Sequence, residues 1–283
     1  MTTHHQHHHP SVVQRQRGAR RSQRLMRRVL PFVASLFLAT PLAGPVARSF
    51  ANAHAAPTPK VVMAAPLSRL ESTARDLYTS LGAEQQGLRF DVFEKALTGY
   101  LNLKQAGRLS EHQQRLTVID FDLPSTEKRL WVLDLAEHKV LFHTLVAHGH
   151  NSGENEASNF SNTDQSNMSS LGFYVTGQEY QGKHGRSLRL QGLDEGFNTN
   201  AAARSVVMHG ADYVSEAFIK QNGRLGRSLG CPALPLDQYA QIIDAVHGGS
   251  CLFLNKSNAG YASKYLNQAT ALAALAAETT SAS

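Results

Sequence analysis

The sequence predicts a mainly β domain of the α+β class, preceded by a helical lead-in. Three observations predict this fold class. Residues 67–106 show apolar residues at helical spacing. Short alternating or apolar runs, typical of strands, follow from residue 115, and turn-forming residues separate those runs. The chain that follows the N-terminal leader is long enough to form one domain with a sizeable core.

The first 55 residues are typical of a signal peptide with a basic leader. Arginine-rich residues 15–28 precede an apolar run at residues 29–39, and Ala53-His54-Ala55 offers a cleavage site with small residues. We therefore expect export to the periplasm or cell envelope. The uncharged stretch 29–47 is long enough for a retained anchor, but its prolines and glycine favour cleavage, so we expect no stable membrane span in the mature chain.

The charge of the chain is concentrated in this leader. The formal net charge is +6, yet residues 1–55 hold eight arginines and neither lysine nor an acidic residue. Removing these eight from the 28 basic residues leaves 20, against 22 acidic residues. The rest of the chain is therefore not basic, and we expect no nucleic-acid partner.

The lead-in follows a short linker. Residues 56–66 are rich in alanine and proline and read as the linker, whereas residues 67–110 form the expected helical lead-in, with helices over 67–80 and 90–106. From residue 111 to residue 256 we expect the catalytic domain. Its first three strands, over 116–121, 129–135 and 138–147, are joined by short turns and predict an antiparallel meander.

The second half of the domain alternates strands, loops and short helices. A polar loop at 149–170 is long enough to indicate a functional role. The remaining expected elements are strands at 171–176, 187–191, 204–208 and 250–254, and short helices at 213–221 and 236–246. Residues 257–283 are expected to form a flexible C-terminal tail.

Two short motifs carry the chemistry. His209-Gly210 ends an apolar strand, and Ser228-Leu229-Gly230-Cys231 follows after a short connection. A cysteine is an effective nucleophile when a base takes its proton and backbone N–H groups face the developing oxyanion. We predict Cys231 as the nucleophile, His209 as the base, the N–H groups of Gly230 and Cys231 as the oxyanion hole, and Ser228 as the group that orients His209.

The second cysteine, Cys251, lies in an apolar run that reads as a buried strand, which favours a structural thiol. A disulfide between Cys251 and Cys231 is the alternative in an exported protein. A metal site at His143, His148 and His150 is a weaker alternative, because no second cluster with ligand spacing accompanies them. We expect neither a metal nor an organic cofactor.

The two motifs together resemble the catalytic domain of the murein L,D-transpeptidases. The resemblance is greatest to the subgroup in which Pro-Ala follows the nucleophile, as Pro232-Ala233 does here, and it covers residues 88–255. It implies an L,D-transpeptidase-like β-sandwich with short helices. Further matching segments are 93–100, 159–162, 182–185 and 188–193.

The resemblance implies a cysteine-dependent acyltransferase that acts on peptidoglycan stem peptides. Cys231 would form a thioester at the third residue of a stem tetrapeptide, with loss of D-Ala, and an amine of another stem would resolve it. Water as the acceptor would make the protein an L,D-carboxypeptidase. A catalytically inactive cell-wall-binding module is the non-enzymatic alternative, and the oligomeric state is open.

One departure from the family pattern concerns positive charge. Many relatives carry an arginine soon after the nucleophile, but no arginine follows Cys231 here. We therefore predict that Arg227 binds a substrate carboxylate. The other candidate substrate-binding residues lie in loops or beside the base: His184, Gly210, Asn159 and Ser161.

Overall fold

The structure is a computed structural model, and it describes residues 68–257 and 260–281. The expected signal peptide and linker, residues 1–66, lie outside these residues. Among the helices of the described part, none combines the length and the hydropathy that a bilayer crossing requires.

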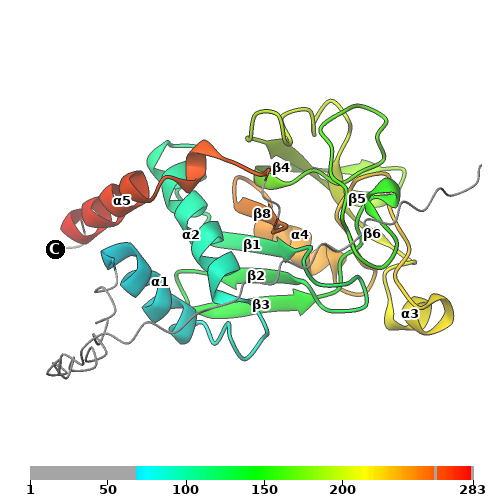
Figure 1. The fold of residues 1–283 in the computed structure, drawn as a ribbon, viewed down its shortest axis with the longest axis horizontal. Helices are drawn as coiled ribbons and strands as arrows, with labels where there is room; N and C mark the ends of the chain where they lie inside the picture. The colour runs from blue at the N-terminus through cyan, green and yellow to red at the C-terminus, as the bar shows by residue number, and fades with distance from the viewer. Residues whose placement is uncertain (1–67, 258–259, 282–283) are drawn as a thin grey trace, which may run out of the picture. The chain divides into compact units, whose positions relative to one another are not determined.

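Two helices form the lead-in, as the apolar spacing predicts (Figure 1): α1 (Arg69–Ser80) and α2 (Phe90–Gln105). The side chain of Ser68 caps α1 by accepting a hydrogen bond from the Glu71 N–H at 3.1 Å. Helix α2 packs on the sheet so closely that a Cβ on Gly99 would lie 2.0 Å from the ring of Phe173. Only glycine allows this approach of helix to strand.

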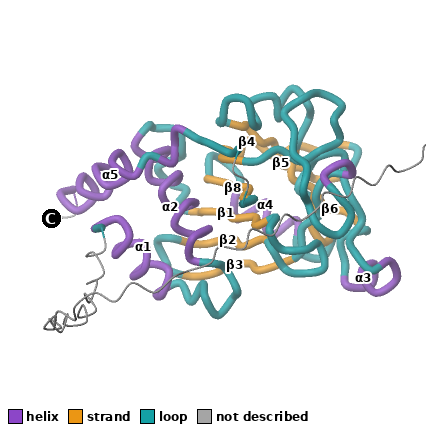
Figure 2. The backbone as a smooth tube through the Cα atoms, in the orientation of Figure 1, coloured by secondary structure: helices purple, strands orange, loops and turns teal. Residues whose placement is uncertain are grey.

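Eight strands form one sheet in the order β3-β2-β1-β8-β4-β5-β6-β7. The first three strands are the predicted antiparallel meander. Their bounds and those of the rest are β1 (Arg115–Asp120), β2 (Leu130–Asp134), β3 (Lys139–Thr144), β4 (Gly172–Gly182), β5 (Gly185–Gly192), β6 (Val207–Ala211), β7 (Ala233–Pro235) and β8 (Cys251–Asn255). Helices α1, α2 and α5 (Gln268–Ser281) lie on one side of the sheet and α4 (Tyr239–Val246) packs on its other face, whereas α3 (Glu216–Asn222) lies apart, near β6, as Figure 2 shows.

The two ends of this strand order meet. Ala147, which follows β3, forms an antiparallel bridge with Ala233 of β7, and the Ala147 N–H donates to the Ala233 carbonyl at 2.9 Å. The sheet is therefore nearly closed into a barrel-like sandwich. The predicted class, a mainly β domain of the α+β class with short helices, is confirmed.

The core has two layers, one on each face of the sheet, and the side chains of β8 point alternately into one and the other. Cys251 and Phe253 face the layer that contains α2, whereas Leu252 and Leu254 face the layer that contains Ile242 of α4 (Tyr239–Val246). Cys251 is fully buried, and both cysteines are free thiols. The structure thus supports a structural thiol at Cys251 and does not form the alternative disulfide.

The C-terminal segment differs from the expected flexible tail, since much of it folds as α5. The side-chain amide of Asn102 donates to the carbonyls of Tyr265 at 2.7 Å and Asn267 at 3.0 Å, which fixes the start of this helix on α2. Ala271 and Ala274 are buried in the same layer. Their small side chains allow close packing, but they give the segment only a weak amphipathic pattern.

Candidate active site

A cleft of about 520 Å³ brings most of the predicted site residues together. It lies between the β4–β5 hairpin, β6 and the loop that precedes β7. The predicted residues that line it are Cys231, His209, Ser228, Arg227 and His184. Gly230, Gly210, Asn159 and Ser161 do not belong to its lining.

Strand pairing places the thiol beside the strand that carries the histidine. In the parallel pair of β6 and β7, His209 is opposite Ala233. Val207 and Cys231 lie two residues before His209 and Ala233 in the chain. The Val207 N–H donates to Sγ of Cys231 at 3.4 Å, and that Sγ lies 3.7 Å from the Ser205 carbonyl. Side chains two residues apart on a strand share a face and are separated by about 7 Å. Cys231 and His209 are therefore held in one cleft by the sheet itself.

The imidazole of His209 is buried and its orientation is fixed. Its Nδ1 lies 2.9 Å from the carbonyl oxygen of Gly210, which can only accept, so Nδ1 carries the hydrogen. The ring also stacks on that of His184, with centroids 4.5 Å apart and planes 22° from parallel. This tautomer leaves Nε2 as the basic nitrogen.

Burial favours the neutral forms of the His209 imidazole and the Cys231 thiol. It lowers the pKa of His209, and the neighbouring His184 and Lys183 act in the same direction, although the hydrogen bond to Gly210 opposes the shift. Burial also raises the pKa of the Cys231 thiol, against the opposing effects of the Val207 N–H and the charges of Arg204 and Lys183. Both shifts favour a thiol and a neutral imidazole over an ion pair.

Ser228 organises the segment 226–232, called the nucleophile loop after the predicted role of Cys231, rather than His209. Its hydroxyl donates to the Cys231 carbonyl at 2.6 Å and accepts from the Gly230 N–H at 3.0 Å. Its carbonyl accepts from the His150 N–H at 2.7 Å. The orienting contact of His209 is instead the carbonyl of Gly210.

The Ser228 hydroxyl also removes one of the two expected donors of the oxyanion hole, because the Gly230 N–H already donates its hydrogen bond to that hydroxyl. In the described part of the chain, no acceptor is hydrogen-bonded to the N–H of Cys231. Gly230 has a φ of +124°, and a Cβ there would lie 2.8 Å from the carbonyl oxygen of Met168. A glycine is thus required for this loop conformation.

Arg227 is bound within the protein, in contrast to the predicted substrate contact. It donates to Glu154 Oε1 at 2.7 Å and to the carbonyls of Gly153 at 2.9 Å and His150 at 3.2 Å, and only 11 % of its side chain is exposed. Its charge is therefore paired with Glu154. The residue fastens the segment 150–154 to the nucleophile loop.

Arg204 is the functional candidate that sequence reasoning missed. It lines the cleft, and its guanidinium donates to the carbonyls of Ser161 at 2.8 Å and Met168 at 2.7 Å and to the hydroxyls of Ser166 and Ser170. No carboxylate of the described residues pairs with it, so its charge is available to the cleft. The available signal was an arginine three residues before the strand that carries His209.

The remaining predicted residues have other surroundings. A Cβ on Gly210 would lie 2.7 Å from the ring of Tyr239, so packing requires a glycine here. Its backbone carbonyl is the group that orients His209. Ser161 offers its carbonyl to Arg204, and the Asn159 N–H donates to the Ser152 carbonyl. Both residues thus belong to the wall of the polar loop, outside the cleft.

The histidines of the weaker metal alternative are used in packing. His148 is buried, and its Nδ1 lies 2.7 Å from Nη2 of Arg129. His143 stacks on Trp131 at 4.9 Å. Between residues 68 and 281, leaving out 258–259, no three His, Cys, Asp or Glu side chains gather as a metal site.

Comparison with known proteins supplies the family. The profile of the L,D-transpeptidase catalytic domain matches residues 84–255, which is more than half of the chain. A comparison with curated proteins found no match.

Solved structures give distant likenesses. The chain is similar to an L,D-transpeptidase from Mycobacterium smegmatis, with 15 % identity, a TM-score of 0.33, and coverage of 50 % of this chain and 59 % of that chain. A helical cell shape determining protein from Campylobacter jejuni matches with 14 % identity, a TM-score of 0.37, and coverage of 65 % and 64 %. An L,D-transpeptidase from Xylanimonas cellulosilytica matches with 12 % identity, a TM-score of 0.32, and coverage of 67 % and 94 %.

The chain thus spans less than two thirds of the length of the Mycobacterium smegmatis protein. The assignment rests on the profile match, which covers the strands, the cleft and both motifs. The chain belongs to the family of the L,D-transpeptidase catalytic domain.

Proposed function

We propose that this member of a family of cell-wall transpeptidases and related proteins is a peptidoglycan L,D-transpeptidase with Cys231 as its nucleophile. The observation that carries the proposal is the pairing of β6 with the nucleophile loop. It holds the Cys231 thiol and the oriented imidazole of His209 in one cleft. We further propose that the chain is exported and works in the cell envelope, where its substrate lies.

In the first half of the reaction, Nε2 of His209 takes the thiol proton while Sγ attacks the carbonyl carbon of the third stem residue. The N–H of Cys231 donates a hydrogen bond to the carbonyl oxygen as negative charge develops on it. The C–N bond then breaks, the imidazolium returns its proton to the leaving amine, and D-Ala departs. A thioester on Cys231 remains. The lowered pKa of His209 and the raised pKa of the Cys231 thiol favour this general-base route over attack by a preformed thiolate.

In the second half, an amine of another stem attacks the thioester carbonyl. His209 accepts a proton from that amine, the C–S bond breaks, and Sγ recovers a proton to restore the thiol. Arg204 and Lys183 give this side of the cleft a positive field. We propose that this field binds the carboxylate of the departing D-Ala, the role that the sequence had suggested for Arg227.

The test is incubation of the purified full chain with disaccharide-tetrapeptide, followed by intact-mass spectrometry of protein and products. We expect a thioester adduct and a cross-linked dimer, both absent from Cys231→Ala and strongly reduced in His209→Gln. His112→Gln is the matched control, since this histidine is exposed and does not line the cleft. Loss of D-Ala without a dimer would instead show an L,D-carboxypeptidase. No adduct and no product would overturn the proposal in favour of a wall-binding module.

A further inference from the structure

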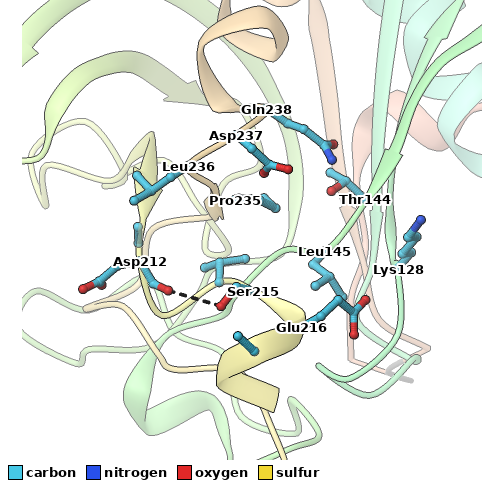
Figure 3. Close-up of a pocket in the computed structure, with 13 residues that line it drawn as sticks. Lys128, Thr144, Leu145, Asp212, Ser215, Glu216, Pro235, Leu236, Asp237 and Gln238 are labelled. Carbon is cyan, nitrogen blue, oxygen red and sulfur yellow. Dashed lines mark hydrogen bonds between the residues drawn. The ribbon is translucent and has the colours of Figure 1, made fainter. Parts of the chain in front are cut away.

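A second cavity, of about 580 Å³, lies outside the cleft and has no part in the proposed reaction (Figure 3). Its walls come from the end of β3, from the segment that joins β6 to α3, and from the segment that joins β7 to α4. The segment 211–214 separates it from the cleft, because Asp212 and Val214 line this cavity whereas Tyr213 lines the cleft. Neither Cys231 nor His209 belongs to its lining.

The floor of the cavity is apolar apart from one threonine. Leu145 and Val214 are 4 % and 1 % exposed, and Pro235 is also buried. Thr144 is only 2 % exposed, and its hydroxyl, which makes no hydrogen bond with the described residues, is not cut off from solvent. Figure 3 shows the Thr144 side chain directed into the cavity, toward Asp237 and Gln238, so a ligand atom could satisfy it.

The rim of the cavity is negatively charged. Asp237 and Glu216 line it and are exposed, while the carboxylate of Asp212 points away (Figure 3). Lys128 is the one cation of the lining. Within the described part of the chain, neither Asp237 nor Glu216 forms an ion pair with it or with another basic residue. The unneutralised carboxylates therefore favour a positively charged ligand.

The combination of floor and rim identifies the kind of cation. A bare metal ion would require converging ligands, and no group of three suitable side chains is present in the described residues. An aliphatic chain that ends in an ammonium has the matching chemistry, because its methylene groups contact the apolar floor while its charged end reaches the carboxylates. A cavity of this size accommodates such a group.

We propose that this cavity is a binding site for a primary ammonium on an aliphatic side chain, as in a lysine-containing peptide. The ammonium is attracted by the unpaired carboxylates of Asp237 and Glu216 on the rim. The hydroxyl of Thr144 pairs with a polar atom of the ligand, and Leu145 and Val214 contact the methylene groups. A peptide bound there would be separated from the cleft by the segment 211–214, whose Tyr213 lines the cleft and whose Asp212 lines this cavity. The site is independent of the chemistry at Cys231.

The test measures binding of Nα-acetyl-L-lysine methylamide to the full chain by ligand-observed NMR. Nα-acetyl-L-norleucine methylamide, which keeps the aliphatic chain and lacks the ammonium, is the comparison probe. We expect the lysine probe to bind more tightly, with an affinity that falls as salt is added. The double variant Glu216→Gln/Asp237→Asn should lose about tenfold or more in affinity, and Thr144→Val about threefold. Glu111→Gln, at an exposed acid elsewhere on the surface, is the matched control.

The outcomes separate cleanly. Equal affinity for the two probes, no binding of the lysine probe, or equal losses in the double variant and in Glu111→Gln would each overturn the site. Circular dichroism and the melting temperature verify that the variants are folded. Cys231→Ala should bind the lysine probe as the native chain does, so a failure of the proposed reaction and a failure of this site are distinguished.

Discussion

Replacement of Ser228 by alanine tests whether this residue acts on the nucleophile loop or on the base. Ser228 is only 5 % exposed, and its hydroxyl makes two hydrogen bonds inside the loop, at 2.6 Å and 3.0 Å. Each such bond contributes about 1 kcal/mol net, and an unsatisfied buried N–H at Gly230 adds to the loss. We therefore expect a cost of about 2 kcal/mol.

This cost should appear mainly in the reaction. If the loop must hold Sγ and the Cys231 N–H in place for attack, about 2 kcal/mol corresponds to a fall of roughly 30-fold in kcat/KM. Because no contact joins Ser228 to His209, the acidic limb of the pH–rate profile should stay where it is. Ser228→Thr keeps a hydroxyl and should recover part of the rate, whereas Ser80→Ala, at an exposed hydroxyl of α1, should change nothing.

The assay is the rate of D-Ala release from disaccharide-tetrapeptide between pH 5 and pH 9, which spans the ordinary range of an imidazole. An unchanged rate in Ser228→Ala would show that the two hydrogen bonds do not position the nucleophile. A displaced acidic limb would show that Ser228 acts on the imidazole after all. Either result would refute the role derived from the loop geometry.

Three further predictions follow from charge and burial. The kcat/KM of the native chain should rise with pH through a midpoint below 6.5, since burial lowers the pKa of His209, and a midpoint above 6.5 would contradict a buried neutral base. Arg204→Gln should raise the pKa of the Cys231 thiol further and slow its alkylation at pH 8, measured by peptide mass mapping; unchanged alkylation would exclude an electrostatic role for Arg204. Burial, with the Arg129 charge, lowers the pKa of His148 to about 4 from 6.5, so the unfolded chain takes up a proton first as pH falls. The free energy of unfolding should drop by up to about 3 kcal/mol between pH 6.5 and pH 4, and urea titrations of His148→Gln should lack that part of the slope.

Elements with a local signal were predictable from the sequence. The two lead-in helices follow from apolar residues three to four apart, and the meander follows from three runs on short turns. Strand β7 has no such signal, because three residues that end in Pro235 show no periodicity. It exists through its parallel pairing with β6, and β6 lies more than twenty residues earlier in the chain.

Residue types, but not partners, could be predicted at the site. The pairing of a His-Gly step with a Ser-x-Gly-Cys step indicated which residues share a cleft, and the structure brings His209 and Cys231 together there. The partners of Ser228 and Arg227 depend on the fold of the polar loop. Glu154, which neutralises Arg227, is 73 residues away in sequence, and no local pattern connects the two.

The position of Arg204 shows why the missing arginine after Cys231 is no loss of charge at the cleft. The residues after the nucleophile, Pro232 and Ala233, are buried as the chain enters β7, so that course offers an arginine little access to solvent or substrate. The turn that leads into the neighbouring strand β6 does, because it places the Ser205 carbonyl 3.7 Å from Sγ, close to the Val207 N–H that donates to Sγ. Arg204 directly precedes Ser205 in the chain, and its Nη2 would lie 3.3 Å from a Cβ on Gly230. A charge distant in sequence is thus brought close to Cys231 by the turn before β6, and a search for basic residues near Cys231 in sequence cannot find it.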